Sequence, residues 1–244
     1  WQHGRQLAGM SKTGTNIAYG YDSDGKRITK TVNGTTYNYH YLGDQLVELT
    51  WGGNKLHFIY DSTGPLSVNY NGTEYFYVKN AQGDVTGMVN ASGTRVVTYT
   101  YDAWGNPLST TGSLATTLGA QNPLRYRGYV YDTETGLYYL QSRYYNPGWG
   151  RFINVDDISV LSESTDKATW DKNLFAYCDN NPVNRADDNG EYWHFIVGAV
   201  VGGFMGAATA FASGEADLIG VLSATIAGAV GGALAASGAG RLIQ

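Results

Sequence analysis

Cysteine, basic residues and a leader sequence are scarce or missing in this 244-residue chain. A single cysteine excludes a disulfide within the chain. Lys and Arg number 16 against 21 Asp and Glu, for a formal net charge of -5. Nucleic acid is therefore excluded as the main partner, because phosphate binding requires concentrated positive charge. The first residues contain neither the basic n-region nor the apolar h-region of a signal peptide, so we expect a piece of a longer protein whose export signal lies upstream.

Spacings typical of metal ligands are also missing. Cys178 has no cysteine or histidine neighbour at ligand spacing, and we expect it to be a small buried apolar residue. The four histidines have no partners at such spacing either, and we expect them at strand or surface positions: His3, His40, His57 and His194. The sequence therefore predicts no metal and no cofactor.

Tyrosine and glycine are abundant, with 20 and 33 residues. Tyrosine favours strands and glycine favours tight turns, so many short strands joined by turns are expected. A repeated pattern of Tyr, Asp and a following Gly supports this view. The copies are Tyr21-Asp22-Ser23-Asp24-Gly25, Tyr60-Asp61-Ser62-Thr63-Gly64, Tyr101-Asp102-Ala103-Trp104-Gly105 and Tyr131-Asp132-Thr133-Glu134-Thr135-Gly136.

Each copy of the pattern predicts the end of a strand and the start of a turn. The Asp side chain accepts backbone N–H bonds and the Gly supplies a positive φ. We assign this turn role to the Asp of all four copies. Residues 36–41 and 73–78 alternate as half-buried strands do, while Asn33-Gly34 and Asn71-Gly72 are strong hairpin signals. Consecutive antiparallel hairpins are therefore expected from about Ala18 to Thr110.

The middle of the chain is less regular. Ser109 to Gln121 is rich in Ser, Thr and Gly and predicts a linker or long loop. The block from Asn122 to Gly190 contains more Arg and predicts further strands, beginning with Asn122 to Gly128. Within it, residues 157–172 predict a polar loop with a short helix, and residues 173–178 predict a short apolar helix. Arg125, Arg127 and Arg143 are expected to stack on Tyr rings and pair with carboxylates.

The composition changes sharply after Gly190. Two long uncharged runs, 192–213 and 218–240, are separated by a short turn that contains Glu215 and Asp217. Small residues recur every four positions, at Gly198, Gly202, Gly206, Gly228 and Gly232. This spacing predicts a helical hairpin whose helices approach closely. Two interpretations compete: insertion in a membrane, which the length of the runs slightly favours, and packing inside a protein shell.

Several motifs in a fixed order resemble one known family. They are Arg125-Tyr126-Arg127-Gly128-Tyr129, the Tyr131 copy continued through Leu137-Tyr138-Tyr139, Ser142-Arg143-Tyr144-Tyr145, Gly150-Arg151-Phe152-Ile153-Asn154, Asn173-Leu174-Phe175-Ala176-Tyr177 and Asn181-Pro182-Val183-Asn184. Together they resemble the Rhs repeat-associated core domain, and the earlier hairpins resemble its YD repeats. The resemblance covers about three quarters of the chain. The family includes bacterial wall-associated proteins, toxin-complex C subunits and the related teneurins.

The resemblance implies a mainly β fold, in which YD-repeat hairpins form part of a β-sheet shell. Three parts are expected: a repeat region, 1–121; the core domain, 122–190; and the hydrophobic helical hairpin, 191–244. The implied function is to enclose and deliver a C-terminal toxin segment of the same longer chain. An immunity protein and a membrane contacted by residues 191–244 are further expected partners, and the expected location is secreted or attached to the bacterial cell wall. The alternative is a non-catalytic module that binds surface glycans, because aromatic-rich β surfaces can stack on sugar rings.

Catalysis is expected at most once, on the chain itself. Many family members carry an aspartyl autoprotease in which two carboxylates share a proton. By resemblance the two carboxylates match Asp156 and Asp187, Arg151 orients the site, and cleavage falls near Gly190 and Glu191. This chain departs from the family pattern, because Asp188 replaces a proline and Glu191 replaces an apolar residue. Turn and cap positions are the alternative role for both aspartates.

Overall fold

The computed structural model of the chain describes residues 1–3, 5–155, 173–187, 190 and 193–195. They divide into two compact units. The first contains residues 1–177 and 188–191, and the second contains residues 178–187 and 192–244. Each unit is described by itself below. The fold is mainly β, as the sequence predicted.

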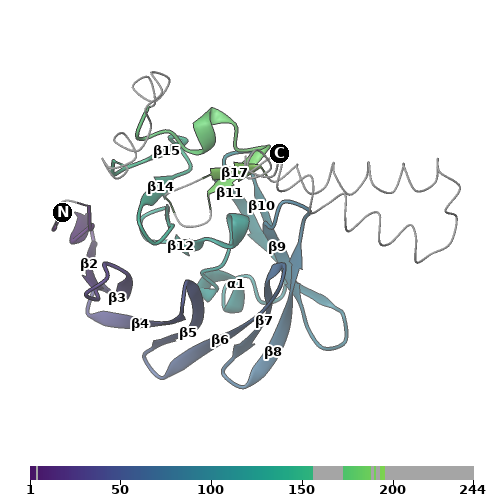
Figure 1. The fold of residues 1–244 in the computed structure, drawn as a ribbon. Coiled ribbons are helices and arrows are strands. Elements are labelled where there is room, and N and C mark those ends of the chain that lie inside the picture. Colours follow the sequence, from purple (N-terminus) through teal and green to yellow (C-terminus); the bar gives the residue numbers. More distant parts are fainter. Residues whose placement is uncertain (4, 156–172, 188–189, 191–192, 196–244) are drawn as a thin grey trace, which may run out of the picture. The chain divides into compact units, whose positions relative to one another are not determined.

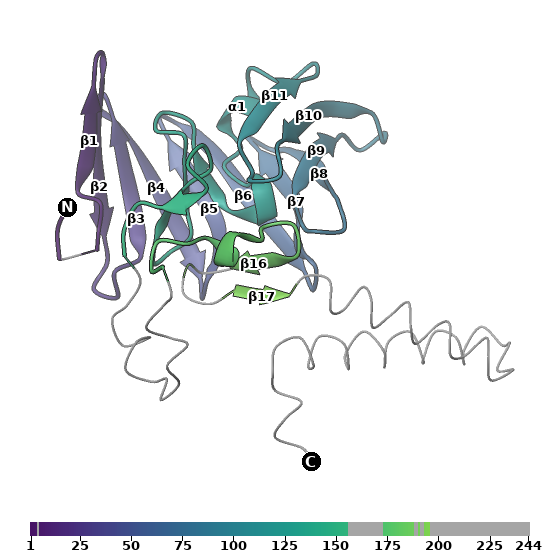
Figure 2. The same ribbon diagram turned by 90° about the horizontal axis from the view of Figure 1, so that it is seen from above.

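The first unit is built on an eleven-stranded antiparallel sheet, here called the YD sheet. The order of its strands follows the order of the chain, so every neighbouring pair is a hairpin (Figures 1 and 2). This confirms the prediction of consecutive hairpins. The strands are β1 Gly9–Lys12, β2 Thr15–Tyr21, β3 Arg27–Val32, β4 Thr35–Leu42, β5 Gln45–Trp51, β6 Asn54–Asp61, β7 Gly64–Tyr70, β8 Thr73–Lys79, β9 Val85–Val89, β10 Arg95–Tyr101 and β11 Pro107–Thr111.

The hairpin turns form as their residues predict. Asn33 and Gly34 have φ values of 47° and 88°, and Asn71 and Gly72 have 49° and 93°. Two successive positive φ values are the geometry of the two-residue turn that matches strand twist. In the YD turns, Asp22 Oδ1 accepts the backbone N–H of Asp24 at 3.1 Å and that of Lys26 at 2.8 Å. The turns after Asp61 and Asp102 use the same carboxylate cap, so the predicted turn role is confirmed for these three residues.

The tyrosine that precedes each turn aspartate links neighbouring hairpins. The ladder shifts register by a bulge beside Tyr21, Tyr60 and Tyr101. Each hydroxyl then donates to a backbone carbonyl 14 to 16 residues earlier: Tyr21 to Leu7, Tyr60 to Leu46 and Tyr101 to Val85, at 2.9, 2.9 and 2.8 Å. A bulge re-aims the side chain that follows it. The repeat therefore fastens each hairpin to its predecessor through one hydrogen bond.

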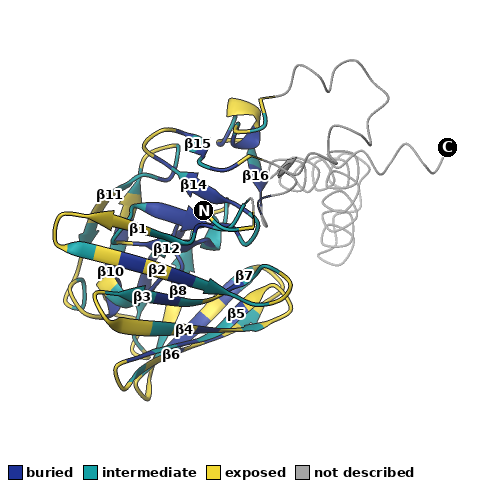
Figure 3. Cartoon of the chain, turned by 90° about the vertical axis from the view of Figure 1, so that its left-hand side faces the viewer, coloured by how far each residue is buried: buried dark blue, intermediate teal, exposed yellow. Residues whose placement is uncertain are grey.

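A second sheet of four short strands lies against the inner side of the YD sheet. Its strands are β12 Val130–Asp132, β13 Leu137–Tyr139, β14 Tyr144–Asn146 and β15 Arg151–Phe152. Figure 1 shows the YD sheet curving around β12, β14 and a short helix, α1 (Leu118–Gln121). We call residues 122–177, as far as the structure describes them, the closing domain. Core residues of the YD sheet such as Leu56, Val68 and Val97 are fully buried, and Figure 3 shows buried residues along β14 as well.

Two irregular segments differ from their predicted structure. Ser109 to Gln121 is not simply a loop, because β11 extends to Thr111 and α1 follows. The apolar side chain of Leu118 explains the difference: it is fully buried, which fixes the segment on the sheet. The strand predicted from Asn122 to Gly128 is also wrong. That segment contains a helical turn, η1 (Tyr126–Gly128), in which Arg127 and Gly128 have positive φ values of 55° and 74°.

The helix predicted over residues 173–178 does not form. Ala176 instead makes an isolated antiparallel bridge with Arg151, and Phe152 N–H donates to the Phe175 carbonyl at 2.9 Å. Apolar composition alone does not separate a short helix from a buried extended segment, and here pairing with β15 decides the conformation. Cys178, which begins the second unit, has 1% of its surface exposed, as predicted.

The second unit contains a turn, η3 (Cys178–Asn180), and a two-stranded sheet of β16 (Arg185–Asp187) and β17 (Trp193–Phe195). Three residues that the prediction assigned to the hydrophobic tail therefore form a strand. The remainder of the predicted helical hairpin, with all five of its spaced glycines, lies outside the described residues, as does the predicted loop and helix at 157–172. Among the described residues, no helix has the length and apolar character needed to cross a membrane.

Candidate functional site

A buried ionic cluster joins the closing domain to the YD sheet. Arg27, the first residue of β3, and Asp132, the last residue of β12, have fully buried side chains. The guanidinium binds the carboxylate through two bonds, Nη1 to Oδ2 at 2.5 Å and Nη2 to Oδ1 at 3.2 Å. Lys30 adds a bond to Asp132 Oδ1 at 3.1 Å and one to Glu134 Oε2 at 2.8 Å. Two cations from one sheet thus meet two carboxylates from the other, and their charges balance.

Aromatic rings surround the Arg27 guanidinium. Its central carbon lies 4.5 Å from the ring centroid of Tyr139, 4.8 Å from that of Tyr39 and 5.2 Å from that of Tyr19. The Arg27 backbone N–H also donates to the Tyr139 hydroxyl at 2.8 Å. Ring faces attract a cation, and their bulk excludes the water that would otherwise weaken the ion pair. The cluster is therefore both an electrostatic and an apolar contact between the two sheets.

The pKa values of the cluster follow from burial opposed by charge. Burial alone would raise the pKa of Asp132, but the Arg27 and Lys30 charges hold it below its ordinary value. Burial alone would lower the pKa values of Arg27 and Lys30, but the Asp132 carboxylate raises both above their ordinary values. All three groups therefore stay charged at neutral pH. Removing one of them would leave a buried charge without its partner.

Asp132 corrects a sequence prediction. The Tyr-Asp pattern assigned it the same turn role as the other three aspartates. In the structure its side chain binds Arg27 and Lys30, while its backbone carbonyl accepts the turn hydrogen bonds from Thr135 and Gly136. The local motif is the same, but its register against β3 buries the carboxylate beside a cation. Burial of this kind is a tertiary property that a local motif does not encode.

The other arginines of the closing domain have structural contacts, as the sequence predicted. The Arg125 guanidinium lies 4.1 Å from the Tyr99 ring centroid, but it binds the backbone carbonyls of Gly119 and Asn122 in place of a carboxylate. Arg127 lies over Tyr126 and pairs with Asp84, with Nη1 and Oδ1 3.5 Å apart. These contacts hold the start of the closing domain on the last strands of the YD sheet.

Three tyrosines of the closing domain bind the last YD turn. The hydroxyls of Tyr126, Tyr145 and Tyr138 donate to the carbonyls of three successive residues, Ala103, Trp104 and Gly105, at 3.1, 2.7 and 2.8 Å. Gly105 has a φ of 84°, and a Cβ added there would lie 2.5 Å from the Tyr126 ring. The turn is therefore both read and covered by the closing domain.

The predicted catalytic residues are placed only in part. Arg151 lies in β15 of the first unit, where Nη1 donates to the Gly150 carbonyl at 3.0 Å. Asp187 ends β16 of the second unit and has 2% of its surface exposed. Asp156 and Glu191 lie outside the described residues. The catalytic assignment of Asp156, Asp187 and Arg151 therefore stays a prediction.

Gly190, at the predicted cleavage boundary, sits in a tight seat made by the 140–143 segment. A Cβ added to it would lie 2.7 Å from Ser142 Oγ and 2.8 Å from the Leu140 carbonyl oxygen, and its φ is 79°. Arg143 Nε donates to the Gly190 carbonyl, and the guanidinium lies 3.7 Å from the Phe152 ring centroid. Arg143 was expected to be structural, so its contact with the boundary is a residue that sequence reasoning missed. Its position before two tyrosines in a family motif was the available signal.

Metal ligation is not evident in the part of the chain that the structure describes. No group of three or more His, Cys, Asp or Glu side chains among those residues is arranged to hold an ion. His3, His40 and His57 all lie at exposed positions, as expected. The chemistry of the described chain therefore rests on hydrogen bonds, ion pairs and aromatic contacts.

These features define a β-hairpin shell scaffold: a repeat sheet whose inner face is bound by a closing domain. The family model for the teneurin YD-shell matches residues 3–183. The chain belongs to this family of Rhs and YD-repeat proteins. The resemblance seen in the sequence motifs is thereby confirmed.

Relatives and solved structures agree with this assignment. The chain is 42% identical over 207 residues to the tRNA3(Ser)-specific nuclease WapA of Bacillus spizizenii, a match covering 82% of this chain and 9% of that protein. It is 29% identical over 224 residues to salivary gland surface protein 1 of Aedes aegypti, covering 82% of this chain and 6% of that protein. The crystal structure of TcdB2-TccC3 without its hypervariable C-terminal region has the same fold, with a TM-score of 0.60 at 20% identity, over 78% of this chain and 10% of that one. The chain thus spans less than a tenth of the length of these curated relatives.

Proposed function

We propose that this chain is the closing part of a YD shell that encloses and delivers a C-terminal toxin carried by the same protein. The observation that carries the proposal is the buried Arg27–Asp132 pair, which fixes the closing domain on the inner face of the YD sheet. A domain held there occupies the side of the sheet on which a shell would keep its contents. The relatives support the toxin, since one is a tRNA nuclease and another solved structure is described by its hypervariable C-terminal region. A secreted or wall-attached bacterial location belongs to the same proposal.

Protease protection in the full-length protein tests the proposal. The segment after Gly190 should resist a soluble protease for as long as the shell is closed. Arg27→Met removes the cation that fastens the closing domain and should expose that segment to digestion. Lys26→Met is the matched control, because Lys26 is the neighbouring cation in a largely exposed pair with Asp44. Rapid digestion of the segment in the wild-type protein would contradict the enclosure.

A second candidate function, self-cleavage, is favoured by the seat of Gly190. Arg143 donates to the carbonyl of the bond that would break, which would polarise that carbonyl toward attack. In the reaction, one carboxylate takes a proton from water, and the resulting hydroxide adds to the Gly190 carbonyl carbon. The second carboxyl group then protonates the leaving amine of Glu191 as the C–N bond breaks. The resemblance assigns these roles to Asp156 and Asp187, with Arg151 as the orienting residue.

Cleavage is read directly on a denaturing gel of the purified protein. A fragment that ends at Gly190, lost in Asp187→Asn, is the expected result. Arg143→Lys keeps the charge but not the geometry of the guanidinium, and it should slow cleavage more than Arg151→Lys does. A single uncut band in the wild-type protein would rule out self-cleavage and would leave the shell proposal intact.

A membrane role for residues 191–244 remains a separate proposal that rests on the sequence pattern. The segment should sediment with liposomes if its uncharged runs enter a bilayer. If it stays in the supernatant, packing within the shell is the better account of its composition.

A further inference from the structure

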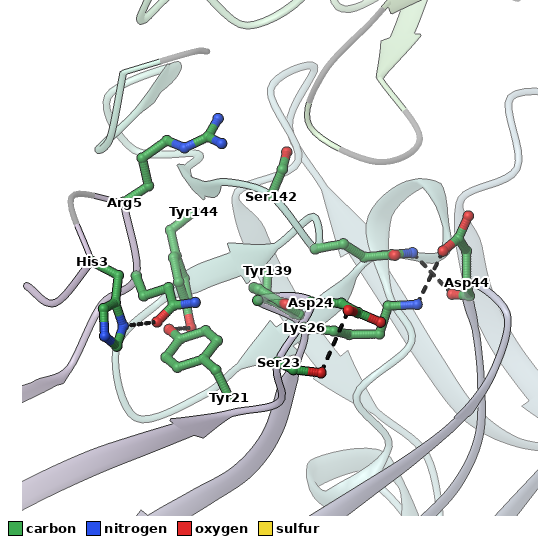
Figure 4. A pocket seen from close by; sticks show the side chains of 13 residues that line it. His3, Arg5, Tyr21, Ser23, Asp24, Lys26, Asp44, Tyr139, Ser142 and Tyr144 are labelled. Carbon is green, nitrogen blue, oxygen red and sulfur yellow. Dashed lines mark hydrogen bonds and ion pairs between the residues drawn. The ribbon is translucent and has the colours of Figure 1, made fainter.

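A cavity of about 500 Å³ opens on the first unit beside the closing domain. Figure 4 shows that its walls come from the N-terminal residues, the β2–β3 turn and the segment that contains Tyr139 to Tyr144. The cavity is within the size range of small-molecule sites, roughly 300–1,000 Å³. Neither the ionic cluster nor the seat of Gly190 accounts for it.

The walls of this cavity carry balanced charge. Lys26 Nζ is already neutralised, because it binds Asp44 Oδ1 at 3.1 Å and the Gly43 carbonyl at 2.6 Å. Asp24, at the tip of the β2–β3 turn, receives only a weak side-chain bond from Ser23, at 3.5 Å. The remaining charged wall residue is Arg5. A site with this balance favours a neutral ligand over a strongly charged one.

Tyrosine hydroxyls supply both a donor and an acceptor in the cavity. Tyr21 uses its hydrogen on the Leu7 carbonyl, so in the 2.7 Å contact between the two hydroxyls Tyr144 must donate to Tyr21. The Tyr144 oxygen is thus left to accept. The Tyr139 hydroxyl accepts from the Arg27 N–H, and among the described residues the structure shows no acceptor for its own hydrogen. Both side chains are 2% exposed, so these groups are held in fixed positions.

We infer that this cavity binds a neutral disaccharide. Sugar hydroxyls donate and accept at the same atom, which matches an adjacent carboxylate, a phenol donor and a phenol acceptor. The half-buried ring of Tyr21 adds an apolar wall for the C–H face of a sugar ring. An anion would face the Asp24 carboxylate, and an apolar ligand would leave the Tyr139 hydrogen and Asp24 unpaired in the complex. The inference is independent of the shell proposal, since it needs no enclosed toxin.

Saturation-transfer NMR and titration calorimetry on the full chain test the site. The probes are cellobiose, maltose and N,N′-diacetylchitobiose, with a sulfated disaccharide as the charged comparison. At least one neutral disaccharide should bind, and it should bind more tightly than the sulfated one. Absence of transfer to all three neutral sugars at millimolar concentration, or tighter binding of the sulfated sugar, would overturn the inference.

Substitutions locate the binding. Asp24→Asn keeps the size of an exposed side chain and should weaken binding at least tenfold, because a charge-assisted bond is lost. Tyr139→Phe should weaken it as well. Ser92→Asn is the matched control, since Ser92 has the same turn position in the β9–β10 hairpin and does not line the cavity. Equal affinity in the wild-type protein and Asp24→Asn would place the sugar elsewhere and contradict the inference.

Discussion

In the YD sheet, each hairpin binds the next through exposed turns, ladder bonds and one tyrosine hydroxyl, whereas the closing domain is held by buried charges and packed rings. Tyr60 reaches a carbonyl only one hairpin away. Arg27 and Asp132, by contrast, are 105 residues apart in the chain and have fully buried side chains. Contacts of the first kind repeat, so the loss of one leaves its copies in place. Contacts of the second kind occur once and leave an unpaired charge when broken.

The largest expected effect therefore comes from the buried pair. Asp132→Asn leaves Arg27 and Lys30 buried without their anion and should lower the free energy of unfolding by about 3–5 kcal/mol. Lys26→Met breaks the exposed pair with Asp44 and should cost about 0–1 kcal/mol. Urea denaturation of the two variants measures the difference. Similar losses in both would remove the distinction between the two kinds of contact.

Acid sharpens the same comparison. Because the pKa of Asp132 is lowered in the folded state, the unfolded chain binds its proton first. The stability from this group is present above the unfolded value of 3.8 and is lost as pH falls through the lower folded value. The stability gap between the wild-type protein and Asp132→Asn should therefore narrow in acid. A gap that stays constant down to pH values below the folded pKa would contradict the ion pair.

Two glycines at the same turn position give the next largest effect. Gly93 and Gly105 have φ values of 78° and 84°, but only Gly105 lies under a ring of the closing domain. Gly93→Ala should cost about 1–2 kcal/mol for the left-handed backbone alone. Gly105→Ala adds the clash with Tyr126, about 1–3 kcal/mol more. Thermal unfolding of both variants checks the order, and equal shifts would mean that the closing domain does not press on this turn.

The smallest effects come from the repeated tyrosines. Tyr60→Phe removes the bond to the Leu46 carbonyl and should cost about 0.5–1.5 kcal/mol. Tyr41 has a buried hydroxyl with no hydrogen-bond partner in the structure. Tyr41→Phe should therefore be neutral or slightly stabilising. Denaturation midpoints that fall equally in both variants would contradict the proposed link between hairpins.

Local rules predicted the YD sheet well and the closing domain poorly. The turns after Asp22 and Asp102 need only the aspartate, the glycine and the strand pattern on either side, all of which lie within a few residues. Asp132 has the same local pattern, but a cation on a distant strand changes its role. The Phe175–Ala176 segment likewise takes an extended form because it pairs with β15. The contact of Arg143 with Gly190 joins residues 47 apart, which no local pattern reports.

Native-state hydrogen exchange of the wild-type protein and Asp132→Asn tests the central claim most directly. If the buried pair fastens the closing domain to the YD sheet, exchange at β12, β13 and β14 should accelerate strongly in the variant. Exchange at β6, β7 and β8 should change much less, because those strands are held by their own hairpins. An equal acceleration in both regions, or none in the closing domain, would contradict the account.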